Sequence, residues 1–126
     1  MLVGTGSELH LCIDAAALLA KDGLFAKVVS MPSIERFMAE PEAYRDEVLP
    51  PSVLVRVTVE AGRTHGWESI AGPFGASVGI DRFGESAPME VLAEHFGFTA
   101  ANVAHVAREA LAALPAKVAA MRGRIG

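Results

Sequence analysis

The sequence contains one cysteine, one tryptophan and one tyrosine among its 126 residues. A single cysteine excludes a disulfide within the chain, and Cys12 falls in an apolar helical pattern that predicts a buried, unreactive thiol. The absence of disulfides favours a reducing compartment, so we expect the cytoplasm. Because 52% of the residues are apolar and so few are aromatic, we expect a core of Ala, Val, Leu and Ile.

Further absences bear on the partners. No apolar run approaches the length of about 18 residues that a membrane helix needs, and the first residues lack the features of a signal peptide. The net charge is −4, and no stripe of Lys and Arg accompanies aromatic side chains that could stack on bases. We therefore expect neither a membrane nor a nucleic acid as partner. The length of 126 residues suits a single domain, residues 1–126.

The most informative feature present is a short, β-branched segment at residues 53–59, Val-Leu-Val-Arg-Val-Thr-Val. Its length and composition predict an interior strand with its four valines on one face and Leu54, Arg56 and Thr58 on the other. Residues 2–3, 25–31 and 76–80 predict three more strands. Helical patterns separate all four, so we expect a three-layer α/β/α fold. Its mainly parallel sheet of about four strands should have the order second, first, third, fourth.

Capping residues and prolines predict the helices between these strands. Ser7 should cap a helix that Gly23 ends, and Ser33 and Pro41 should begin two short ones. Residues 67–71 predict one helical turn and residues 89–96 another helix. Thr99 should cap the last helix, which Pro115 should kink or end, leaving the remainder as a loosely held tail.

Candidate binding residues are few. The turn Gly4-Thr5-Gly6-Ser7 before a helix could hold an anion, although a tight turn without a ligand is favoured because the dinucleotide fingerprint is incomplete. The loop after the central strand offers Glu60, Gly62 and His65, and Asp81 with Arg82 follows the last strand. The pairs His10–Asp14 and His105–Glu109 lack a third metal ligand. We predict no catalytic, cofactor-binding or metal-binding residue.

Several segments together resemble the C-terminal domain of transketolase, in order and in spacing, over essentially the whole chain. They are Gly4-Thr5-Gly6-Ser7-Glu8, Val28-Val29-Ser30-Met31-Pro32-Ser33, Tyr44-Arg45, Val48-Leu49-Pro50-Pro51, Val59-Glu60-Ala61-Gly62, Gly66-Trp67, Gly79-Ile80-Asp81-Arg82-Phe83-Gly84-Glu85-Ser86-Ala87-Pro88 and Phe96-Gly97-Phe98-Thr99.

This resemblance implies a thiamine-diphosphate enzyme of the pentose phosphate pathway that moves a two-carbon ketol unit between sugar phosphates. In that family the first two of three α/β domains bind the cofactor, the Mg ion and the substrate across a dimer interface. The third domain is structural, with regulation as a further role. The resemblance thus implies that this chain binds no cofactor, that it is inactive alone, and that its partners are the preceding domains and a second copy.

In the family's third domain, one antiparallel strand precedes the region that resembles this chain. The resemblance therefore implies N-terminal truncation and an open edge at residues 25–31. We expect the chain to form a two-fold dimer, through that edge or through the surface around residues 60–67 and 81–88. Two alternatives remain open. One is a stand-alone small-molecule or anion-binding α/β module that uses Gly4–Ser7 with Glu60–His65. The other is the C-terminal domain of a related thiamine-dependent enzyme.

Overall fold

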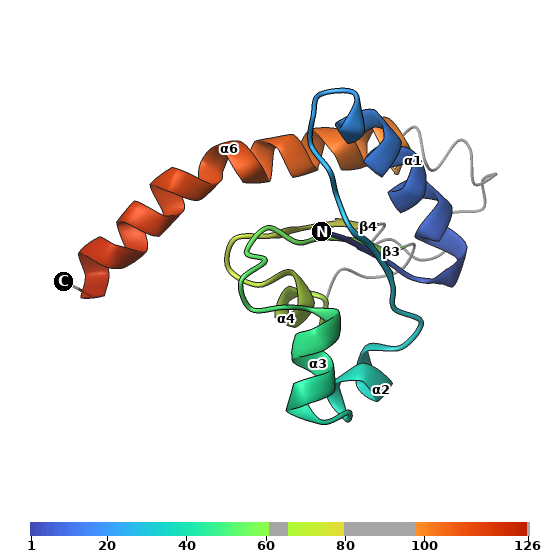
Figure 1. The fold of residues 1–126 in the computed structure, drawn as a ribbon, viewed down its shortest axis with the longest axis horizontal. Coiled ribbons are helices and arrows are strands. Elements are labelled where there is room, and N and C mark those ends of the chain that lie inside the picture. The colour runs from blue at the N-terminus through green and yellow to red at the C-terminus, as the bar shows by residue number, and fades with distance from the viewer. Residues whose placement is uncertain (61–65, 80–97, 126) are drawn as a thin grey trace.

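The computed structural model describes residues 1–60, 66–79 and 98–125 (Figure 1). Four parallel strands form one sheet in the order β2-β1-β3-β4, which confirms the predicted topology. The strands are β1 (Leu2–Gly4), β2 (Val28–Ser30), β3 (Val57–Glu60) and β4 (Ala76–Gly79). The described helices are η1 (Gly6–Glu8), α1 (Leu9–Ala20), α2 (Ile34–Met38), α3 (Glu42–Val48), α4 (Glu68–Ala71) and α6 (Ala100–Ile125).

The sheet separates two hydrophobic clusters, because alternate side chains of a strand point to opposite faces. Leu2 of β1 packs with α1 and α6 on one face, and the adjacent Val3 packs with residues of α2, α3 and α4 on the other. Figure 1 shows α1 and α6 above the sheet and the three short helices below it. The fold is therefore the predicted three-layer α/β/α arrangement.

Most helix ends follow the sequence signals. The Ser33 hydroxyl accepts from the Arg36 amide at 3.2 Å, and the Thr99 hydroxyl accepts from the Asn102 amide at 3.1 Å. Gly23 has a φ of +77°, which suits glycine at the end of α1. Ser7 does not begin α1 as predicted, because η1 intervenes and Glu8 occupies the N-cap. The helix predicted at residues 89–96 falls outside the described residues.

Two predicted strands are shorter in the structure. The central strand covers Val57–Glu60 rather than residues 53–59, and β2 covers Val28–Ser30 rather than residues 25–31. The ladders on both sides of β1 are short, because β1 has only three residues and offers its neighbours few backbone groups for pairing. As predicted, β2 lies at an edge of the sheet.

The last helix is longer than predicted. α6 continues through Pro115 to Ile125, so the residues expected to form a loose tail are helical. Proline removes one backbone donor from a helix and commonly bends it. Figure 1 shows α6 curving along its length, with its second half extending beyond the sheet.

Candidate functional site

The carboxyl ends of β1, β2 and β3 meet at one edge of the sheet, where α/β proteins usually bind ligands. The Thr5 amide donates to the Val59 carbonyl at 3.4 Å, and the Met31 amide donates to the Gly4 carbonyl at 2.8 Å. Thr5, Gly6 and Glu60 therefore lie at the same edge. Gly62, His65, Asp81, Arg82 and the Ser7 side chain fall outside the described residues.

A carboxylate occupies the turn after β1. The Thr5 hydroxyl donates to Glu8 Oε2 at 2.5 Å, and the Glu8 residue is only 5% exposed. A buried carboxylate repels other anions and leaves the Thr5 donor already engaged. The Gly4–Ser7 turn is therefore closed by the protein's own negative charge, which argues against its use as a phosphate cradle.

Close packing explains the first glycine of this turn. A Cβ atom at Gly4 would lie 2.9 Å from Cys12 Sγ, whereas a Cβ at Gly6 would meet no atom within 4 Å. Cys12 is fully buried, as predicted, and burial next to Glu8 raises the pKa of its thiol to about 11. The thiol is thus protonated at neutral pH and serves to fill the core.

We expect Gly4→Ala to lower the free energy of unfolding by about 1–3 kcal/mol, because the added methyl group meets a sulfur atom that has little room to move. Gly6→Ala, the matched control in the same turn, should change the free energy by less than about 0.5 kcal/mol. Urea denaturation measures both values. If packing is the cause, adding Cys12→Ala to Gly4→Ala should recover part of the loss. Equal effects of the two glycine substitutions would contradict this explanation.

Trp67 is part of the core and does not contribute to an open binding surface. It is 5% exposed and packs in the cluster that contains Val3, Met31 and Ile70. Trp67 therefore adds no exposed apolar area to the predicted surface around residues 60–67 and 81–88, of which residues 61–65 and 81–88 fall outside the described residues. Gly66 shapes the turn before it, with a φ of +90° and an amide that donates to Glu68 Oε2 at 2.6 Å.

The two predicted histidine pairs remain on helix surfaces. His10, Asp14, His105 and Glu109 are all exposed. Within residues 1–60, 66–79 and 98–125, no group of three His, Cys, Asp or Glu side chains could hold a metal ion. In the same ranges, no helix combines the length and apolar character needed to cross a bilayer.

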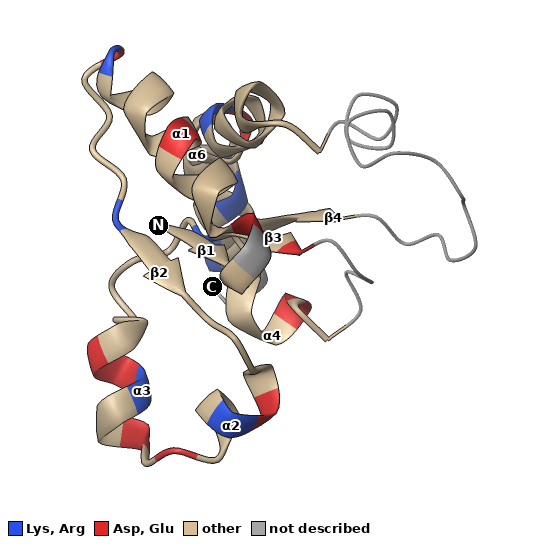
Figure 2. Ribbon diagram, turned by 90° about the vertical axis from the view of Figure 1, so that its right-hand side faces the viewer, with Lys and Arg blue, Asp and Glu red and all other residues tan. Residues whose placement is uncertain are grey.

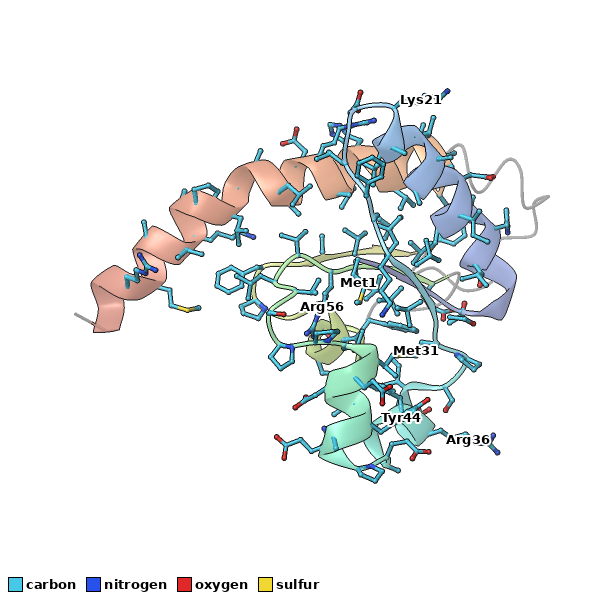
Figure 3. All side chains as sticks on the ribbon, viewed as in Figure 1. Met1, Lys21, Met31, Arg36, Tyr44 and Arg56 are labelled. Atoms are coloured by element: carbon cyan, nitrogen blue, oxygen red, sulfur yellow. The ribbon has the colours of Figure 1, made fainter. Side chains whose placement is uncertain are left out.

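Arg56 makes a set of contacts that the sequence did not reveal. Its guanidinium donates to the carbonyls of Leu49, Pro50, Val53 and Ile70 at 3.3, 2.9, 3.1 and 3.3 Å. Figure 3 shows Arg56 below the sheet, between it and the short helices. Burial is the largest influence on the pKa of Arg56, and it lowers that pKa. The polar residue in an otherwise apolar segment was the available signal, but it does not specify which carbonyls the side chain reaches; three belong to residues 49–53 and the fourth to Ile70.

The sheet order and the two helical layers define a doubly wound α/β domain, and in it the turn after β1 is closed by Glu8. The Transketolase-like TK C-terminal domain family matches residues 1–99 of the chain. The chain belongs to this family.

Three transketolases illustrate the similarity. The chromosomal transketolase of Cupriavidus necator is 54% identical over 108 residues, which are 86% of this chain and 16% of that protein. The structure of transketolase from Leishmania mexicana has a TM-score of 0.76 and 44% identity, and the match covers 86% of this chain and 15% of that one. A Pichia stipitis transketolase solved with sedoheptulose 7-phosphate has a TM-score of 0.78 and 35% identity, covering 88% and 16%. This chain thus spans about a sixth of the length of these relatives.

Proposed function

We propose that this chain is the C-terminal domain of a transketolase, a transferase that moves a two-carbon ketol unit between sugar phosphates in the pentose phosphate pathway. The family match over residues 1–99 carries the proposal. The Pichia stipitis structure with sedoheptulose 7-phosphate supports a sugar phosphate as substrate. Thiamine diphosphate and Mg are the cofactors of the proposed whole enzyme, which acts in the cytoplasm as a homodimer.

Within that enzyme, we assign this domain a structural role. The turn after β1 holds the buried Glu8 carboxylate, and Thr5, its best-placed hydroxyl, donates to that carboxylate. The described residues also contain no group able to hold a metal ion. These observations support placing the cofactor, the Mg ion and the reaction in the preceding domains, which are the proposed partners of this one.

The alternative of a stand-alone anion-binding module is not favoured. It required the Gly4–Ser7 turn to accept a ligand, but the carboxylate of Glu8 lies against Thr5 in that turn. The match to transketolases also extends over most of the chain, including segments distant from the turn.

A chimaera tests the proposal. Residues 1–126 replace the matched segment of Cupriavidus necator transketolase, and ketol transfer from xylulose 5-phosphate to ribose 5-phosphate is measured. We expect the chimaera to retain activity within about tenfold of the parent, a loss of about 1.4 kcal/mol in transition-state stabilisation. The parent enzyme without its C-terminal segment is the control for the contribution of the domain.

The 126-residue chain alone should show no ketol transfer, and thiamine diphosphate with Mg should not raise its melting temperature. A ligand that binds only the folded state raises that temperature. A rise of several degrees would therefore contradict the structural role, and a folded but inactive chimaera would contradict the transketolase assignment.

A further inference from the structure

A cavity of about 230 Å³ lies at the amino end of β1, between the sheet and the helices α1 and α6. Its lining is mostly apolar and includes Leu19, Leu24, Phe25, Val55 and Leu111. Three of these side chains, Leu24, Phe25 and Leu111, are 36%, 89% and 40% exposed. An apolar cavity of about 150 Å³ can hold a group the size of benzene, so this one has room for one large apolar side chain.

The register of the sheet indicates what would enter this cavity. Leu2 of β1 pairs with Val57 of β3. The ladder continues one residue earlier, because the Val57 amide donates to the Met1 carbonyl at 2.9 Å and the Met1 ammonium donates to the Val55 carbonyl at 3.1 Å. In the same register, a residue joined to Met1 would lie between Ala26 and Val55. Figure 2 shows the N-terminus at the start of β1, beside the connection that leads from α1 to β2.

The alternation of side chains would direct that residue into the cavity. Leu2 packs in the cluster of α1 and α6, whereas Met1 and Val3 pack in the cluster on the other face of the sheet. A residue joined to Met1 would share the face of Leu2, because side chains alternate along a strand. Its side chain would therefore point toward Leu19 and Leu111, which line the cavity.

Both neighbours of β1 begin later than their composition predicts. Residues 25–27 and 53–56 belong to the predicted strands, but β2 begins at Val28 and β3 at Val57. These two stretches flank the start of β1, where the Leu2 amide donates to the Lys27 carbonyl at 2.8 Å. A strand requires a neighbour with which to pair, so the late start of both follows from the short length of β1. A longer β1 would extend all three strands at the same end.

The charge of Met1 also favours a continued chain at this position. Burial, and to a smaller extent the nearby Arg56, lowers the pKa of the Met1 ammonium. A charged amine loses hydration in such a place. A peptide amide would donate the same bond to the Val55 carbonyl without that charge, and would therefore suit the site better.

We propose that an extended apolar segment binds here as a continuation of β1, between residues 24–27 and 53–55, and places one large apolar side chain in the cavity. Main-chain hydrogen bonds give affinity and the cavity gives specificity, as in complexes where a peptide adds a strand to a sheet. The occupant is the segment that joins the preceding domains of the proposed whole enzyme to Met1, so the inference rests on the proposed function. Most of the Cupriavidus necator relative lies outside the match, which covers 16% of it.

This contact differs from the open β2 edge that the family resemblance implies. The proposed segment lies inside the sheet, in line with β1 and with a neighbour on each side. A strand at the β2 edge would instead have a neighbour on one side and would leave the cavity unfilled.

Two extensions of the 126-residue chain test the proposal. One adds Thr-Val-Thr-Leu before Met1, and the matched control adds Thr-Val-Thr-Asp. We expect the first to raise the melting temperature by about 5 °C or more, because a leucine side chain becomes buried. The second should raise it by less than about 2 °C, since an apolar cavity does not solvate a carboxylate.

Two further measurements locate the added segment. In the proposed register, the Lys27 and Val55 amides donate to the last two added residues, so the leucine extension should slow their hydrogen exchange by about tenfold or more. Leu111→Ser removes part of the cavity lining and should reduce the gain in melting temperature by about half. Ile13→Ser is the matched control, because Ile13 is 54% exposed on α1 and does not line the cavity, and it should leave the gain unchanged.

Equal shifts from the two extensions, or a leucine extension that protects neither amide, would overturn the proposal. If the chain without an extension is unfolded at room temperature, circular dichroism makes the same comparison. The leucine extension must then fold the chain and the aspartate extension must not. Neither measurement uses ketol transfer, so a failure here is distinguishable from a failure of the chimaera that tests the proposed function.

Discussion

Gly75→Ala is expected to prevent the chain from folding stably. A Cβ atom at residue 75 would lie 2.2 Å from the Arg56 carbonyl oxygen and 2.3 Å from the Ala71 carbonyl oxygen. Both are backbone atoms of different segments, so relief of the two clashes requires a shift of residue 75 away from both the end of α4 and the residue before β3. The Ala76 amide donates to the same Arg56 carbonyl at 3.0 Å, and movement would therefore also disturb the first bond between β3 and β4.

We expect this substitution to cost about 4 kcal/mol or more, which is a large share of the stability of a domain of this size. Soluble yield and urea denaturation measure the effect. Gly123→Ala is the control, because a Cβ there meets no atom within 4 Å and residue 123 lies within α6. Alanine favours helix over glycine by about 0.5–1 kcal/mol, so the control should be neutral or slightly stabilising. If Gly75→Ala left the free energy of unfolding unchanged, residue 75 could not lie as close to the carbonyls of Arg56 and Ala71 as described here.

The second large effect is expected at Arg56. Replacing it with methionine keeps an apolar stem of similar length but removes the donors to four carbonyl groups. We expect a loss of roughly 2–4 kcal/mol, because part of the freed carbonyl surface regains water while the rest stays poorly solvated. Urea denaturation at neutral pH measures the change.

Two further variants separate geometry from charge at this site. Arg56→Lys keeps the positive charge but lacks the planar, five-donor group, so it should recover less than half of the loss. Arg45→Met is the control on α3, where the guanidinium donates to the Glu40 carbonyl at 3.1 Å, and it should cost less than about 1 kcal/mol. Full rescue by lysine would mean that charge, and not the geometry of the four bonds, determines the effect.

The sheet order could be predicted from the sequence because it depends on general features. Four apolar segments alternate with helical patterns, and right-handed crossovers then leave few arrangements of the strands. The Ser33 and Thr99 caps were also predictable, since a cap is a local interaction between residues three apart. These features require no knowledge of distant contacts.

Other features depend on side-chain and backbone conformations that the pattern of residue types does not specify. Residues 53–56 have the composition of a strand, yet Arg56 turns back to the Val53 carbonyl and the pairing with β1 begins at Val57. Pro115 is exposed, and α6 continues past it. At the candidate site, the closure of the turn by Glu8 depends on a side-chain conformation that glycine spacing does not specify.

The position of β1 in the sheet has a consequence for the order of events during protein synthesis. β1 is the first described element to leave the ribosome, but one of its two neighbours, β3, begins only at Val57. Leu2 is buried with Val103, Ala104 and Ala107 of α6, which are made much later. A nascent chain that ends before α6 therefore leaves part of this face open, since α1 and α6 cover it together. The apolar side chains that α6 covers therefore stay accessible to chaperones until α6 has been made.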